Sequence, residues 1–257
     1  MLKFCSLFSG SSGNSFFITD GKTNILIDSG VSSKKITNVL QTMHIDNIDA
    51  ILVTHEHTDH VSGLSVLSSK LNVPVYANNK TWDAMKREKD KIKNQKTFNI
   101  SEAFEIGSLK IFPFLLPHDA AAPCGFNIFD GKEKLSIATD LGHVDNKTFD
   151  HFLGSSSILL EANYDSEILK VSSYPYLLKQ RISSPFGHLS NDMAGNTISK
   201  LVDSGLKNAL LVHLSKENNF SELVYKTIEE KLNEKNHSTE HISINIAPRT
   251  EPSSMFG

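Results

Sequence analysis

Five short apolar runs in this 257-residue chain each end, within a residue or two, on a histidine or an aspartate. Apolar runs of this length indicate buried strands. An ionisable side chain just beyond a buried strand is costly unless something compensates its charge. Because the pattern occurs five times, we infer that the five side chains share one charge-balancing group at one edge of a sheet. A metal centre is the simplest such group. The residues that end the runs are Asp28, His55, His118, Asp140 and His213.

The second run leads into the densest part of the pattern, His55-Glu-His57-Thr-Asp59-His60. Alternate side chains of an extended chain point the same way, so His55 and His57 can reach one ion. Asp59 and His60 come where a helix over Val61–Leu71 is expected, and their diverging side chains can reach a second ion. Histidine and carboxylate ligands suit zinc, manganese or iron. The competing interpretation is a solvated polar loop, which three histidines between a buried strand and a helix disfavour.

This motif resembles the signature of the metallo-β-lactamase fold, and the other site residues follow in that family's order. The resemblance implies an α+β fold, a four-layer αβ/βα sandwich with two sheets face to face and helices outside. It also implies two divalent ions, zinc or manganese, with iron as a further candidate. By the same resemblance one ion is held by His55, His57 and His118, and the other by Asp59, His60 and His213. Asp140 would bridge them, and Asp28 would orient a ligand from behind.

Five segments resemble the YycJ/WalJ-like exonuclease branch of that family: residues 6–15, 53–60, 174–181, 187–191 and 213–219. The resemblance implies a metal-dependent hydrolase, a dinuclear phosphodiesterase that acts as a 5′-to-3′ DNA exonuclease and cleaves by a metal-activated hydroxide. The expected partner is nucleic acid, DNA rather than RNA. Alternatives stay open: hydrolysis of a small or cyclic-nucleotide phosphodiester, RNA-end processing, and opening of a thioester or lactam.

Two residues are predicted to take part in the chemistry, and three to bind substrate. Asp59 would accept a hydrogen bond from the attacking hydroxide. His188 lies in a Gly-His element one helix before the last ligand, which resembles the tRNA 3′-end-processing branch and implies a general acid at the leaving oxygen. An ordinary turn histidine is the alternative for His188. Glycines and serines over 9–14 can bring N–H and hydroxyl donors to an anion, although a plain hairpin turn would look the same. The predicted substrate contacts are Ser12, Asn14 and Ser190.

The ligand candidates stretch from Asp28 to His213, so we expect a single domain over residues 1–257, with a frayed tail over 248–257. A net charge of −3 gives no global attraction to nucleic acid or membranes. No apolar stretch approaches the roughly eighteen residues that a membrane span needs. Cys5 and Cys124 lack metal or redox spacing, which predicts free buried thiols and a cytoplasmic protein. A charged helix is expected over Thr81–Lys93.

Overall fold

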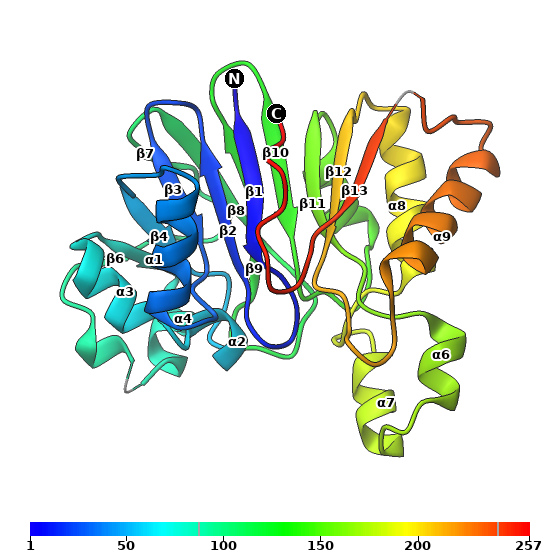
Figure 1. Cartoon of the computed structure of the whole chain (residues 1–257), viewed down its shortest axis with the longest axis horizontal. Helices are drawn as coiled ribbons and strands as arrows, with labels where there is room; N and C mark the ends of the chain where they lie inside the picture. The colour runs from blue at the N-terminus through cyan, green and yellow to red at the C-terminus, as the bar shows by residue number, and fades with distance from the viewer. Residues whose placement is uncertain (87, 241) are drawn as a thin grey trace.

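Two β-sheets face each other through the middle of the molecule, and helices cover their outer faces (Figure 1). The structure is a computed structural model, and it describes residues 1–86, 88–240 and 242–257. One apolar cluster fills the space between the sheets, and two others fill the spaces between each sheet and its helices. The chain therefore has the four-layer αβ/βα arrangement of an α+β sandwich, which confirms the predicted architecture.

The first sheet has the strand order β1-β2-β3-β4-β5-β6 within the described residues. The strands β1, β2 and β3 pair antiparallel, whereas β3 to β6 pair parallel. The strands are β1 (Lys3–Phe8), β2 (Ser15–Thr19), β3 (Asn24–Ile27), β4 (Ala50–Leu52), β5 (Val75–Ala77) and β6 (Gln95–Thr97). The helices on this side are α1 (Ser33–Thr42), α2 (Thr58–Val61), α3 (Leu64–Leu71) and α4 (Asn79–Ala84).

The second sheet repeats this plan in the order β13-β12-β11-β10-β9-β8-β7, with antiparallel pairs from β7 to β10 and parallel pairs from β10 to β13. Its strands are β7 (Phe104–Ile106), β8 (Leu109–Leu115), β9 (Cys124–Phe129), β10 (Lys134–Ala138), β11 (Ser157–Glu161), β12 (Asn208–Val212) and β13 (Ser243–Ile246). The helices that cover it are α5 (Asn146–Phe152), α8 (Asn191–Val202) and α9 (Ser221–Asn233).

Strand β12 shows why such strands are apolar along their whole length. Leu210 and Val212 belong to the core between the sheets, whereas Ala209 and Leu211 belong to the core under the helices. Alternate side chains of a strand point to opposite faces, so a strand covered on both faces needs an uninterrupted apolar run. The first polar residue after the run then marks the edge of the sheet.

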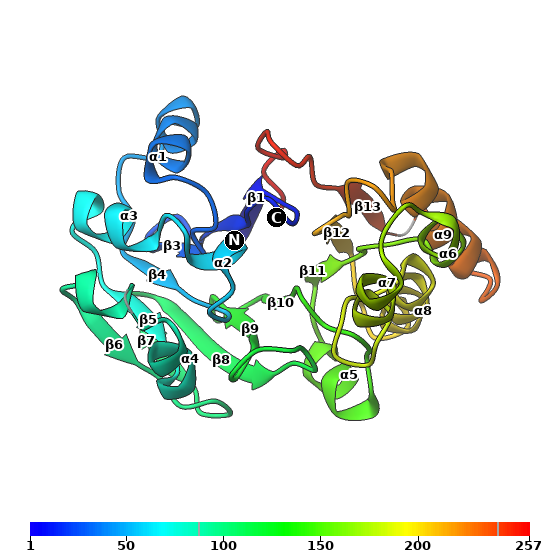
Figure 2. The ribbon, with the colours of Figure 1, turned by 90° about the horizontal axis from the view of Figure 1, so that it is seen from below.

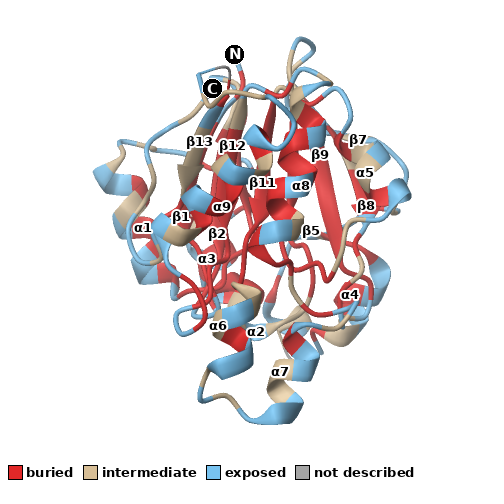
Figure 3. Cartoon of the chain, turned by 90° about the vertical axis from the view of Figure 1, so that its right-hand side faces the viewer, coloured by how far each residue is buried: buried red, intermediate tan, exposed pale blue. Residues whose placement is uncertain are grey.

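The carboxyl ends of β3 and β4 in one sheet meet those of β8, β10, β11 and β12 in the other. In Figure 2, which views the molecule from below, α2 lies on the side of the first sheet and α7 (Tyr176–Ile182) on the side of the second. Helices α6 (Ser166–Val171) and α7 project from this edge, and much of their surface is exposed (Figure 3). The predicted site residues therefore gather at one edge beside a projecting helix pair.

Two predicted helices are shorter than the sequence suggests. The helix expected over Val61–Leu71 is divided between α2 and α3 at Gly63, where a Cβ atom would lie 2.0 Å from the carbonyl oxygen of Val31. The helix expected over Thr81–Lys93 ends with α4 at Ala84, and only a 3₁₀ turn, η1 (Lys89–Lys91), follows it. No apolar residue lies between Met85 and Ile92 to pack such a helix on the sheet. Position 87 of this expected helix lies outside the described residues.

The last residues of the chain lie against the edge strand β1. Phe4 and Phe256 exchange two backbone hydrogen bonds of 2.9 Å, and their ring centroids are 5.7 Å apart. An edge strand offers unpaired N–H and C=O groups, and the Phe256 ring adds apolar contact with the core between the sheets. This docked tail differs from the frayed end that the sequence predicts. None of the helices in the described part of the chain has the length and apolarity to cross a membrane.

Candidate metal centre

Three site residues adopt left-handed backbone conformations where their strands end. The φ angles of Asp28, Asp140 and His213, which follow β3, β10 and β12, are 62°, 61° and 59°. Non-glycine residues rarely adopt this conformation, because it costs of the order of 1 kcal/mol. At each position the chain turns sharply at the sheet edge; Asp140 and His213 belong to the ligand groups, whereas Asp28 contacts His60 from behind. The backbone is thus strained at the points where the site is assembled.

Four histidines of the site each have one ring nitrogen held by a neighbouring group. Such a contact sets the ring orientation and leaves the opposite nitrogen, Nε2, to face the centre of the site. The Nδ1 contacts are 3.0 Å from His55 to the Thr54 hydroxyl, 2.7 Å from His60 to Asp28, 2.9 Å from His118 to the carbonyl oxygen of Gly187, and 2.8 Å from His213 to Glu161. The rings are therefore oriented before any ligand binds.

The ligand atoms form overlapping groups within which all atoms lie no more than 4.8 Å apart. One group combines histidines of the 55–60 motif with His118, which follows β8. Another combines Asp59 and His60 of the same motif with His213, which follows β12. Asp140 lies between them, with Oδ2 3.0 Å from Nε2 of His60 and Oδ1 3.8 Å from Nε2 of His118. The first group is His55, His57 and His118, and the second is Asp59, His60 and His213. Two further groups, His55 with His60 and Asp140, and Asp140 with Glu161, His188 and His213, satisfy the same distance. The predicted ligand sets are therefore two of the four groupings that the geometry allows among the described residues.

Buried nitrogens at this centre lack partners among the described residues. Nε2 of His55 and Nε2 of His213 are inaccessible to solvent and make no hydrogen bond. A buried polar atom without a partner costs about 1–3 kcal/mol, which a coordinate bond would remove. Nitrogen and carboxylate donors on opposite sides of a gap suit a divalent cation. The residues present therefore fit the divalent-metal binding that the motif indicates.

Burial and neighbouring charges shift the pKa values of the side chains in this cluster. Burial lowers the pKa of His55 well below its usual value, and the nearby His60 lowers it further. Burial opposes charge on His213 too, but the carboxylates of Asp140 and Glu161 raise its pKa to about 10. Burial would raise the pKa of Asp140, yet His213 and His60 hold it well below its usual range. The pKa values of the buried histidines and carboxylates are thus set by one another's charge.

Asp28 contacts the candidate ligands on the side away from the centre. It is fully buried, and besides His60 it accepts hydrogen bonds from the backbone N–H and the hydroxyl of Thr54, at 2.8 and 2.7 Å. Thr54 in turn contacts Nδ1 of His55 at 3.0 Å. One carboxylate thus connects ligand histidines assigned to the two groups.

The three predicted substrate contacts lie elsewhere than expected. Asn14 is fully buried; its Oδ1 accepts from Gly10 N–H at 2.9 Å, and its Nδ2 lies 3.1 Å from Nε2 of His60. Ser190 is the N-cap of α8, where its hydroxyl accepts from Met193 N–H at 3.3 Å. Ser12 lines a separate surface pocket outside the metal cleft. Asn14 and Ser190 support the loops rather than face a substrate, because burial keeps both from solvent.

Sequence reasoning missed Glu161, the buried last residue of β11. Its Oε1 accepts hydrogen bonds from Nδ1 of His188 at 2.7 Å and of His213 at 2.8 Å. Its Oε2 accepts from the N–H groups of Leu141 and Leu189 at 3.0 and 3.1 Å. The signal was present, because Ile158–Leu160 is a sixth apolar run that ends on an ionisable residue.

His188 lies at the cleft, with its side chain 14% exposed and its Nδ1 held by Glu161. Burial opposes its protonation, but Glu161 raises the pKa of His188 above the usual histidine value. The cleft encloses about 300 Å³. Its lining includes Ser11, Asp59, Tyr174, Arg181 and His188, and Arg181 pairs with Asp119 at 2.6 Å. The walls thus carry both charged and aromatic groups.

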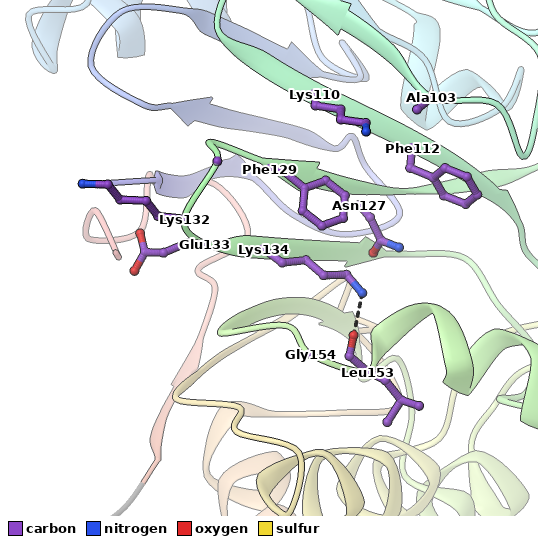
Figure 4. Close-up of a pocket in the computed structure, with 11 residues that line it drawn as sticks. Ala103, Lys110, Phe112, Asn127, Phe129, Lys132, Glu133, Lys134, Leu153 and Gly154 are labelled. Carbon is purple, nitrogen blue, oxygen red and sulfur yellow. Dashed lines mark hydrogen bonds between the residues drawn. The ribbon is translucent and has the colours of Figure 1, made fainter.

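A larger cavity of about 850 Å³ lies on the outer face of the second sheet (Figure 4). There Nζ of Lys134 donates to the carbonyl oxygens of His151 and Leu153, both at 2.7 Å. This lysine therefore satisfies carbonyls at the C-terminal end of α5. None of the predicted metal ligands lines this cavity, so its chemistry is separate from that of the metal centre.

Residues 9–207 match the model of the metallo-beta-lactamase superfamily. The chain belongs to this superfamily. Within it, the chain resembles the WalJ and YycJ proteins over nearly its whole length. It is 39% identical over 236 residues to exodeoxyribonuclease WalJ of Streptococcus pneumoniae serotype 2, covering 90% of this chain and 88% of that protein. It is 34% identical over 238 residues to exodeoxyribonuclease YycJ of Bacillus anthracis, covering 91% and 90%. This confirms the resemblance read from the sequence.

Solved structures support the fold alone. The metallo-beta-lactamase fold protein YhfI from Bacillus subtilis superposes with a TM-score of 0.74 at 16% identity, covering 98% of each chain. Human tRNase Z, short form, superposes with a TM-score of 0.67 at 16% identity, again covering 98% of each chain. A shared fold does not fix a function, so function has to be argued from the site.

Proposed function

We propose that this chain is a divalent-metal-dependent exodeoxyribonuclease that removes nucleotides from the 5′ end of DNA. The observation that carries the proposal is its 39% identity to an exodeoxyribonuclease along nine-tenths of the chain. The cleft geometry agrees with phosphodiester hydrolysis, because a histidine held by a buried carboxylate stands beside the candidate ligands. The identity to exodeoxyribonucleases, rather than the cleft geometry, favours DNA cleavage over hydrolysis of small phosphodiesters or RNA-end processing.

We assign the ligands as the sequence predicts them, for two ions that are zinc or manganese. His55, His57 and His118 would hold one ion, Asp59, His60 and His213 the other, and Asp140 both. When bound, such ions activate water for attack on phosphorus and neutralise the charge of the transition state. The two free, buried thiols, Cys5 and Cys124, are in keeping with a site of action in the reducing cytoplasm.

The chain's own residues would then control proton movement. Asp59 has a side chain 26% exposed to the cleft, so it can accept a hydrogen bond from the attacking water. As the bond between phosphorus and the 3′ oxygen of the terminal nucleotide breaks, His188 gives its proton to that oxygen. Glu161 holds the His188 ring in place and favours its protonated form. The products are a free nucleotide and a shortened strand that carries the phosphate.

The test is a time course on duplex DNA with purified protein, supplied with manganese or zinc. We expect a 5′ label to leave at once as a mononucleotide, whereas a 3′ label should pass through a ladder of shorter strands. Asp59→Asn should lose most of this activity while still folding. Failure to release nucleotides from DNA with any divalent metal would contradict the proposal. A higher kcat/KM on RNA or on cyclic nucleotides would replace it with one of the alternatives.

A further inference from the structure

A second pocket lies between the projecting helices α6 and α7, next to the metal cleft. It encloses about 520 Å³, within the range of roughly 300–1,000 Å³ that is typical of small-ligand pockets. Tyr164, Tyr174 and Tyr176 contribute aromatic surface, and Leu169 lies among them. The other residues that line it are Ser166, Lys170, Lys179, Gln180 and Ser183. The pocket therefore combines flat apolar surfaces with hydrogen-bonding groups.

Tyr174 lines both this pocket and the metal cleft. The two spaces are thus neighbours that share one wall residue. Arg181 is on α7 and also lines the cleft. The same short helix pair therefore takes part in both spaces.

The residues at the base of the pocket are buried and packed, whereas Tyr176 at its rim is exposed to solvent. Tyr164 and Leu169 are buried and pack with Ile182, Tyr174 and Leu178. Tyr176 is 72% exposed, and its hydroxyl accepts a hydrogen bond from Gln180 at 2.8 Å. A partly exposed aromatic ring above a packed floor offers a stacking surface at little cost in conformational freedom.

The charge of the helix pair also suits a strand of DNA. Helices α6 and α7 carry the basic side chains Lys170, Lys179 and Arg181. Lys170 pairs with Glu167 and Arg181 with Asp119, both at 2.6 Å, so Lys179 is the one of the three without an acidic partner among the described residues. Cationic groups beside aromatic faces are the usual means of holding single-stranded nucleic acid without reading its sequence.

We propose that the pocket between α6 and α7 receives the unstacked base of the 5′-terminal nucleotide while its phosphodiester occupies the metal cleft. The inference rests on the proposed function and adds a substrate subsite to it. Stacking on Tyr174 would hold the terminal base away from the duplex. It would also position the phosphodiester bond that is cleaved in the metal cleft. Since every base has a π-face, the subsite would accept all four nucleotides.

The test compares two duplexes that differ only in whether the 5′-terminal nucleotide carries a base or is abasic. We expect the protein to favour the intact end by about 10- to 100-fold in kcat/KM, the range that the loss of one stacked base gives. Tyr174→Ala should bring this ratio close to one, mainly through KM on the intact end, and Tyr174→Phe should restore it. Tyr225→Ala, an exposed tyrosine on α9 that lines neither pocket, is the matched control and should keep the ratio.

The outcomes separate the subsite from the activity. Equal cleavage of both duplexes by the unaltered protein overturns the subsite and leaves the exonuclease proposal intact. An unchanged preference in Tyr174→Ala also overturns it, because the preference then comes from elsewhere. If the unaltered protein releases nucleotides from neither duplex, the proposed function itself fails, and the subsite fails with it.

Discussion

Replacing Glu161 by glutamine tests the support behind the metal centre, because this buried side chain accepts four hydrogen bonds at once. His188 and His213 donate to one oxygen, and the N–H groups of Leu141 and Leu189 donate to the other. Glutamine has the same shape but only one acceptor oxygen, and its NH₂ group donates. In Glu161→Gln, one of the two pairs of donors must therefore face another donor.

The two orientations of the amide predict different losses. If the oxygen faces the histidines, two buried backbone N–H groups lose their acceptor, at about 1–3 kcal/mol each. The total of about 2–6 kcal/mol corresponds to a fall in melting temperature of roughly 5–20 °C for a chain of this size. If the oxygen faces the backbone, the histidines lose the contact that orients them, and metal affinity falls by about 10- to 100-fold.

Thermal unfolding of the metal-free protein and competition with a chromogenic zinc chelator would measure these two losses. We expect at least one of them in Glu161→Gln. Glu230→Gln, on the exposed face of α9, provides the control and should change neither quantity. If Glu161→Gln keeps both its melting temperature and its metal affinity, the carboxylate does not support the site, and our reading of the buried network is wrong.

Three further predictions concern the loop, the ion and the thiols. Gly30→Ala would place a Cβ atom 1.6 Å from the carbonyl oxygen of Asp59, so both thermal stability and zinc affinity should fall, and a variant that matches the original in both would contradict the close approach. Adding zinc at about 100 times its dissociation constant to metal-free protein should stabilise the fold by about 2.7 kcal/mol, seen as a rise in melting temperature, whereas no shift would mean that no ion binds the folded state. Burial raises the pKa of the Cys5 thiol to about 12, so the thiolate is scarce at pH 8; iodoacetamide should label it only after denaturation, and rapid labelling of native protein would count against its burial.

Most of the fold could be predicted from hydrophobic pattern and motif order. The runs over 50–54 and 209–212 were predicted as strands because they are continuously apolar; the structure has β4 over Ala50–Leu52 and β12 over Asn208–Val212. The predictions that failed concern backbone contacts between distant segments. Gly63 divides one helix because Val31 lies against it, and Phe256 docks on Phe4. Neither of these contacts between distant segments can be recognised in the local sequence.

The residues of the candidate site also fall into those that local sequence identifies and those that only tertiary contacts reveal. The histidines and aspartates at strand ends were identified because an ionisable group beside a buried strand needs compensation. Asn14 and Ser190 were given substrate roles from their turn-like surroundings, yet burial places them beneath the surface. Glu161 was passed over because a lone glutamate at a strand end has no motif around it, although its position obeys the same rule.

The amino-acid sequence by itself indicated the layered architecture and the candidate metal ligands, because the order of its motifs resembles that of a known family and strand-end histidines and aspartates can be recognised locally. Only the tertiary structure decided which nitrogen of each histidine faces the centre, since that depends on partners from other strands, such as Asp28 and Glu161. The left-handed turns at Asp28, Asp140 and His213 were likewise decided there, because only the packed sheets can hold three strained residues in place.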